Sequence, residues 1–130
     1  MKIRLKSHKD LIVWQKAMNL IIKVYKSTGL FPKEELYGLT SQMRRAAVAI
    51  PSNITEGYQR NSLKEYIQFL YIARASAAEL ETQLLAAKGL DFINNGEYST
   101  IDELLTEILK MLNSLIQKLK AKPYPLKPNS

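Results

Sequence analysis

The sequence contains no cysteine and only one histidine, His8. A disulfide framework, a thiolate metal site and a cysteine nucleophile are therefore excluded, and no histidine pair is present for a metal or catalytic site within a helical bundle. The five glycines are isolated, so no glycine-rich phosphate loop exists. We expect a protein without catalytic activity, metal or cofactor, with His8 in a flexible N-terminal arm.

Long apolar runs are also missing. The longest run without a charged residue, 46–55, is about half as long as a membrane-spanning helix requires. The N-terminal residues are basic and polar, with none of the apolar core that a secretory signal needs. We expect a cytoplasmic protein with no membrane partner.

The net charge of +7 is concentrated at the two ends of the chain. Residues 1–9 and 118–130 contain eight of the 19 basic residues and no acidic residue, whereas the segment between them is close to neutral. We expect a basic N-terminal arm (1–9), a folded body (10–121) and a Pro- and Lys-rich tail (122–130). Basic arms are typical of RNA- or DNA-binding proteins, although Lys-rich ends that only raise solubility give the same pattern.

Four segments repeat their apolar residues at helical spacing, and no segment alternates as a strand does. We expect helices over about 10–28, from a start between 34 and 41 to Gly57, over 62–89, and from 100 to about 119. The short connections favour antiparallel neighbours. The predicted fold is an all-α, up-down-up-down four-helix bundle.

Residues at the expected helix ends support these boundaries. Asp10 is a candidate N-cap of the first helix, and Ser62 and Thr100 each open a capping box. We expect 94–96 to form a turn before the fourth helix. Pro51 lies inside the second helical pattern, where it removes a backbone donor and predicts a kink.

The first helix has a wider apolar face than a position between two neighbours requires. Two stripes lie side by side on it: Leu11, Trp14, Met18, Ile21 and Tyr25, and Val13, Ala17, Leu20 and Val24. Either the helix is enclosed on most sides, or its outer stripe contacts another subunit.

Four arginines are candidates for contacts with nucleic-acid phosphates, because the planar guanidinium matches phosphate geometry: Arg44, Arg45, Arg60 and Arg74. Ion pairs with Glu56, Glu79 or Glu81 on neighbouring helices would explain the same residues. Together with the basic ends, the predicted nucleic-acid-binding set is Arg4, Lys6, Lys9, Arg44, Arg45, Arg60, Arg74, Lys118, Lys120 and Lys122.

Several blocks of the sequence resemble one known family. They are 11–17 (LIVWQKA), 42–57 (QMRRAAVAIPSNITEG), 69–74 (FLYIAR) and 79–82 (ELET). Over about 10–119 the chain is similar to the four-helix-bundle, ribosomal-protein-like proteins encoded by intervening sequences in bacterial 23S ribosomal RNA genes. It departs from the family at Ala75-Ser76-Ala77, where a Gly-Ser pair is common, and in its basic C-terminal tail.

The resemblance implies a ring-shaped homopentamer, which would cover the outer stripe of the first helix. It also implies a link to nucleic acid, because a diverged relative, the accessory variability determinant of diversity-generating retroelements, binds nucleic acid and a reverse transcriptase. We therefore expect a non-catalytic, oligomeric protein that binds RNA or DNA through basic tails and surface arginines. The alternative is a protein–protein adaptor for a reverse transcriptase.

Overall fold

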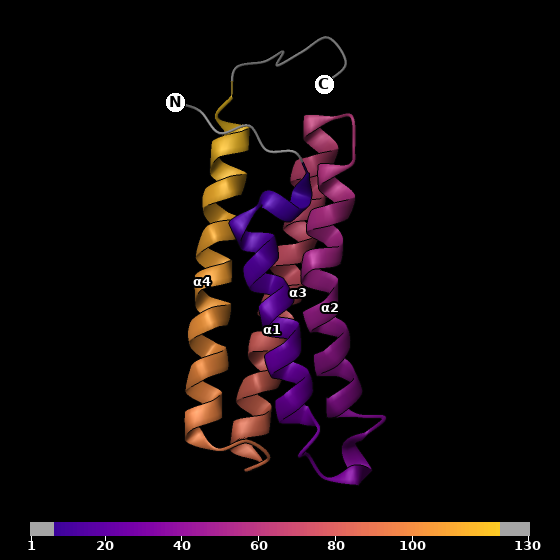
Figure 1. Cartoon of the computed structure of the whole chain (residues 1–130), viewed down its shortest axis with the longest axis vertical. Helices are drawn as coiled ribbons and strands as arrows, with labels where there is room; N and C mark the ends of the chain where they lie inside the picture. Colours follow the sequence, from indigo (N-terminus) through magenta and orange to yellow (C-terminus); the bar gives the residue numbers. More distant parts are fainter. Residues whose placement is uncertain (1–6, 123–130) are drawn as a thin grey trace.

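The computed structural model describes residues 7–122 and contains no strand within that range. Four long helices run antiparallel in the order up, down, up, down (Figure 1). The elements are η1 (His8–Asp10), α1 (Ile12–Thr28), η2 (Lys33–Glu35), α2 (Leu39–Tyr58), α3 (Leu63–Gly89) and α4 (Asn95–Lys120). Each long helix packs against the next one in the sequence, and α1 also packs against α4. The predicted four-helix bundle is confirmed.

One continuous apolar core fills the space between the helices. On α1 it is the stripe Val13, Ala17, Leu20 and Val24 that is buried. The core face of α3 carries three fully buried alanines, Ala73, Ala77 and Ala87. Small side chains there let the neighbouring helices come close, so the bundle packs tightly rather than enclosing a cavity.

The helices α2 and α3 lie very close together at Gly57, near the C-terminal end of α2. A Cβ atom built on Gly57 would lie 2.8 Å from Phe69 Cβ, 3.0 Å from Tyr66 Cδ1 and 3.1 Å from the Tyr66 carbonyl oxygen. Real Cβ atoms essentially never show the first of these distances, and the other two are tighter than most Cβ contacts. Glycine is therefore required by the packing of the two helices.

The structure confirms one of the predicted helix starts and corrects another. Ser62 caps α3, because its side chain accepts a hydrogen bond from the backbone N–H of Glu65. The fourth helix starts earlier than expected: Asn94 is its N-cap and accepts from the N–H of Glu97 at 2.8 Å. The prediction of a turn over 94–96 and a cap at Thr100 was wrong. The Thr100 hydroxyl instead donates to the Gly96 carbonyl one turn back.

The first helix also begins differently from the prediction. Asp10 belongs to the short turn η1, where its carboxylate accepts from the N–H of Ser7, and α1 starts at Ile12. His8 is not in a flexible arm: its ring packs edge-on against Trp14, with centroids 5.2 Å apart, and against Tyr58. An aromatic contact therefore holds this part of the N-terminal segment against the bundle.

Pro51 lies within α2 and is buried, and the helix continues through it from Leu39 to Tyr58. The proline has no N–H to offer the carbonyl of Ala47. Two residues later, the Asn53 side chain donates to the Ala49 carbonyl at 2.8 Å. Continuation of the helix is confirmed, and a bend at Pro51 stays a prediction.

We expect the alkaline stability of the protein to depend on Tyr66. Burial, and to a lesser extent the neighbouring Tyr58, raises the pKa of Tyr66 to about 12 from its ordinary 10.0. Because the folded state holds the phenol proton more tightly, the stabilisation from Tyr66 is complete below pH 10 and is lost as the pH rises towards 12. Urea unfolding at pH 9 and 11 measures this loss, which should be smaller in Tyr66→Phe. An equal loss in both proteins would contradict the assignment.

Candidate nucleic-acid interface

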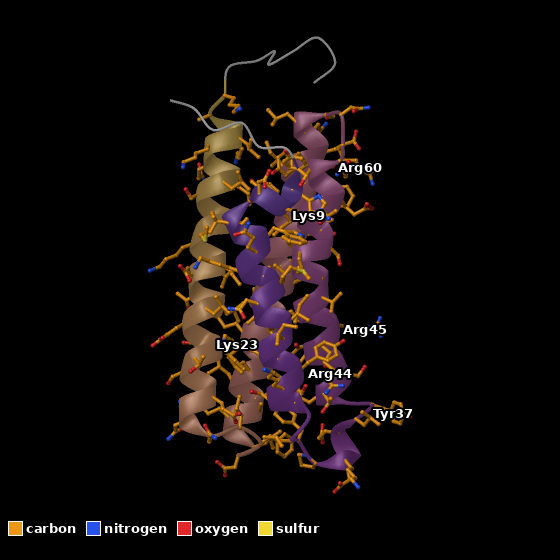
Figure 2. All side chains as sticks on the ribbon, in the orientation of Figure 1. Lys9, Lys23, Tyr37, Arg44, Arg45 and Arg60 are labelled. Atoms are coloured by element: carbon orange, nitrogen blue, oxygen red, sulfur yellow. The ribbon has the colours of Figure 1, made fainter. Side chains whose placement is uncertain are left out.

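The chain enters and leaves the described part of the structure at the same end of the bundle (Figure 1). This basic end carries Lys9, Arg60, Lys64, Lys118, Lys120 and Lys122, against the acidic residues Asp10, Glu56 and Glu65. The far end holds six of the twelve acidic side chains, Glu34, Glu35, Asp91, Glu97, Asp102 and Glu103, together with the basic Lys23, Lys26, Lys33, Arg44 and Lys88. Figure 2 shows Lys9 and Arg60 toward the basic end and Lys23, Tyr37 and Arg44 toward the far end. The excess of basic over acidic side chains therefore lies at the basic end.

Arg44 holds the end of α1 in place. Its Nε donates to the Thr28 hydroxyl at 2.9 Å, and its Nη2 donates to the Tyr25 carbonyl at 3.4 Å. The guanidinium also stacks over the Tyr25 ring, 4.5 Å from the centroid. A cation near the C-terminal end of a helix also interacts favourably with the helix dipole. Arg44 makes no ion pair with a glutamate within residues 7–122, and a contact between Arg44 and phosphate stays a prediction.

Arg60 bridges two carboxylates at the α2–α3 connection. Its guanidinium lies 3.7 Å from Glu56 and 3.8 Å from Glu65, and it stacks over the Phe69 ring. The partner Glu56 was one of those expected from the sequence. Exposed ion pairs of this kind add little stability. Because both carboxylates neutralise the Arg60 guanidinium, Arg60 attracts a phosphate less strongly than an unpaired basic residue would.

Arg74 lies on a surface that α3 and α4 form together. Its Nη1 donates to Asn113 Oδ1 at 2.9 Å, and its guanidinium stacks over Tyr71, 4.7 Å from the ring centroid. Lys120 Nζ donates to the Tyr71 hydroxyl at 3.2 Å. We call these four residues, Tyr71, Arg74, Asn113 and Lys120, the α3–α4 basic face.

Acidic residues are absent from this part of the surface. Neither 66–78 on α3 nor 108–122 on α4 contains an aspartate or a glutamate. The bonds to Asn113 and Tyr71 use only part of the donor capacity of Arg74 and Lys120. The α3–α4 basic face can therefore bind an anion without first breaking an internal ion pair.

The remaining predicted residues are spread over the molecule. Arg45 is exposed on α2 and has no partner among residues 7–122, and Figure 2 shows it directed outward. Lys9, Lys118 and Lys122 are exposed at the basic end. Arg4 and Lys6 lie outside the described residues.

The contacts between the two helices of the α3–α4 basic face were not predicted from the sequence. Asn113 is 39 residues from its partner Arg74 in the sequence, and Tyr71 is 49 residues from its partner Lys120. The helical spacing of apolar residues predicts which residues of each helix face inward. It does not predict which outward-facing residues of two helices contact each other. The absence of acidic residues after Glu107 was the available signal.

A second exposed surface is apolar. On α1, Ile12, Met18, Ile22 and Tyr25 remain exposed, and Ile22 keeps 52% of its accessible surface. Val48 of α2 is also exposed, and it lines a hollow of about 250 Å³ together with Trp14, Met18 and Ile21. Trp14 is fixed there by donating its Nε1–H to the Thr55 hydroxyl at 3.0 Å. Within a single chain, the outer stripe of α1 is thus not enclosed.

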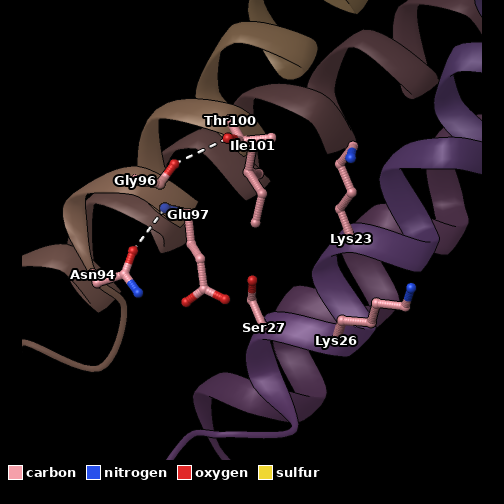
Figure 3. A pocket seen from close by; sticks show the side chains of 8 residues that line it. All are labelled: Lys23, Lys26, Ser27, Asn94, Gly96, Glu97, Thr100 and Ile101. Atoms are coloured by element: carbon pink, nitrogen blue, oxygen red, sulfur yellow. Dashed lines mark hydrogen bonds between the residues drawn. The ribbon is translucent and has the colours of Figure 1, made fainter.

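Other possible sites are few within residues 7–122. No group of three or more His, Asp or Glu side chains there is placed to hold a metal ion. None of the helices in this range is long and apolar enough to cross a membrane. A hollow of about 520 Å³ lies between α1 and the start of α4, where the Ser27 hydroxyl and the Glu97 carboxylate point into the same space (Figure 3).

Comparison with known proteins relates the whole bundle to one family. The family model for the 23S rRNA-intervening sequence protein matches residues 9–114. The structure is similar to the crystal structure of a protein of unknown function from the S23 ribosomal protein family of Bacteroides thetaiotaomicron VPI-5482. The two share 27% identity and superpose with a TM-score of 0.76, covering 82% of this chain and 96% of that one. No curated protein matches the sequence.

Proposed function

The chain belongs to the family of 23S rRNA-intervening sequence proteins, and on that premise we propose that it is a non-catalytic, cytoplasmic RNA-binding protein. The observation that carries the proposal is the α3–α4 basic face, where Arg74 and Lys120 flank Tyr71 on a surface without acidic residues. Basic and aromatic side chains in this arrangement suit the phosphates and bases of a nucleic acid.

The basic end extends this surface. Lys120 belongs both to the α3–α4 basic face and to the last turn of α4, so a strand bound at Arg74 continues toward Lys122. Lys9 lies at the same end of the bundle. Several weak phosphate contacts in a row give an affinity that rises with the number of contacts and falls with salt.

We further propose that the protein is a homo-oligomer, with a pentamer as the expected form. The exposed apolar residues of α1 and the adjoining hollow by Val48 support an interface there, because large apolar side chains gathered on one side of a helix favour association. Several α3–α4 basic faces on one assembly would bind a single RNA with increased avidity.

The test is RNA binding across a salt series. We expect filter binding to give a measurable affinity for single-stranded RNA at low salt, with a steep loss as salt rises. The double variant Arg74→Gln/Lys120→Gln removes two phosphate contacts. It should reduce the slope of log K against log salt by about 1.4, which is twice the value for one contact on a single strand.

The matched control is Lys23→Gln/Lys26→Gln, which removes the same charge from α1 toward the far end of the bundle. It should leave the salt slope close to that of the wild type. Equal losses in both double variants would mean that only net charge attracts the RNA. No binding at low salt would sink the proposal and favour the alternative, an adaptor for a reverse transcriptase, which copurification with that enzyme would then test.

A further inference from the structure

A pocket of about 340 Å³ lies at the far end of the bundle, where the connection between α1 and α2 folds back on both helices. Its lining includes Thr28, Phe31, Lys33, Leu36, Thr40 and Arg44. This volume is in the range that small-molecule sites occupy. The lining combines an apolar wall from Phe31 and Leu36 with two cations, and it contains no acidic residue.

Arg44 is held rigidly at this pocket. The Thr28 hydroxyl and the Tyr25 carbonyl fix two of its nitrogens, and the Tyr25 ring supports the guanidinium plane. Thr28 is itself fixed, since its hydroxyl donates to the Val24 carbonyl at 2.7 Å. The guanidinium keeps free N–H groups, and a donor that is already fixed loses little entropy when a ligand binds.

Thr40 is a second feature of the pocket that indicates a ligand site. It is only 3% exposed, and its hydroxyl has no hydrogen-bond partner within residues 7–122. Within this range, the polar side-chain atoms that are fully buried and have no partner are His8 Nδ1 and Gln83 Oε1. Thr40 Oγ1 is not one of them, so it is still accessible to solvent. Because Thr40 lines the pocket, the pocket is where its oxygen is accessible. A hydroxyl that has no partner in the protein and is accessible from the pocket can donate to a ligand bound there.

Glu35 is not part of the lining, and its carboxylate accepts from the N–H of Leu39 at the start of α2. The larger hollow between α1 and α4 differs, because the Glu97 carboxylate faces its interior and offsets part of the charge of Lys23 and Lys26 (Figure 3). The lining of the pocket at Arg44 thus has two cations and no carboxylate, whereas that of the larger hollow includes one carboxylate.

We propose that this pocket binds a small organic phosphate, with the phosphoryl group on Arg44, Lys33 and Thr40 and the organic part against Phe31 and Leu36. Donors from three side chains suit a phosphoryl group, which has three acceptor oxygens and carries close to two negative charges. A carboxylate has two oxygens in one plane and less charge. This proposal is independent of RNA binding, because the α3–α4 basic face contributes no residue to the pocket.

The experiment titrates the full chain with phenyl phosphate and follows backbone amide shifts in two-dimensional NMR. We expect saturable shifts at Gly29 and Thr40, with weaker binding of benzoate and of inorganic phosphate. Thr40→Val should weaken phenyl phosphate binding about tenfold, the usual effect of losing one hydrogen bond to a charged group. It should not lower the melting temperature, because the lost hydroxyl has no partner in the protein.

Two further variants complete the test. Thr82→Val removes an exposed hydroxyl of α3 that bonds only to the Ala78 carbonyl, and it should leave the affinity unchanged. Lys33→Gln, at the exposed rim, should weaken binding severalfold without affecting the fold. An absence of saturable shifts, equal binding of benzoate, or unchanged affinity in Thr40→Val would each overturn the proposal, and none of these results depends on RNA.

Discussion

Replacement of Gly57 by alanine is expected to lower the free energy of unfolding by about 2 kcal/mol, as overpacking of a well-packed core commonly does. The new methyl group would lie 2.8 Å from Phe69 Cβ and 3.1 Å from the Tyr66 carbonyl oxygen. Neither atom is the far end of a flexible side chain, so α2 and α3 themselves must move apart. Alanine is the better helix former, which offsets part of this cost.

Urea unfolding at a fixed protein concentration measures this effect, and a melting temperature lower by roughly 8 °C should accompany it. Gly89→Ala is the matched control, because no atom lies within 4 Å of a Cβ built on Gly89 at the end of α3. That variant should be neutral or more stable by up to about 1 kcal/mol. If the two variants were equally stable, the close contact at Gly57 would not restrict the size of the residue at that position.

Introducing a charge among the exposed apolar residues of α1 is expected to dissociate the oligomer. In Ile22→Glu, a side chain that is 52% exposed in the single chain would bring an unpaired carboxylate into the proposed interface. Burial of an unpaired charge costs several kcal/mol per subunit, and this cost is repeated at every interface of a ring. Light scattering should therefore give the mass of the wild type as a multiple of 14.8 kDa and that of the variant as a single chain.

Leu85→Glu provides the comparison, since Leu85 is 53% exposed but lies on α3, away from the proposed interface. It should keep the wild-type mass. Circular dichroism must show the same helicity in both variants, so that dissociation is not confused with unfolding. A wild-type protein that scatters as a monomer would contradict the oligomer directly.

The fold could be predicted because helical spacing repeats over many residues. Seven residues of α3 and six of α4 are buried at this spacing, so a single misleading residue changes little. Helix starts depend on one or two residues, and there the sequence offers competing choices. Asn94 and Thr100 are both good N-caps, and α4 begins at the first of them.

The candidate site could be predicted only in part, because side-chain partners are set by packing between helices. Arg44 reads as a surface cation in the sequence, yet its partners lie 16 and 19 residues away on α1. Arg74 was identified, and Tyr71 lies three residues before it on the same helix, but Asn113 became its neighbour only through the register of α3 against α4. Such register is a property of the whole core and has no local signal.

The uneven charge along the bundle has a consequence for the approach of a polyanion. A body whose basic excess lies at one end has an electric dipole along its helices, and a nucleic acid would turn it before contact is made. In a ring whose subunits point the same way these moments add. One rim of the ring would then face the polyanion, while the opposite rim, with the pocket at Arg44, would remain open to small metabolites.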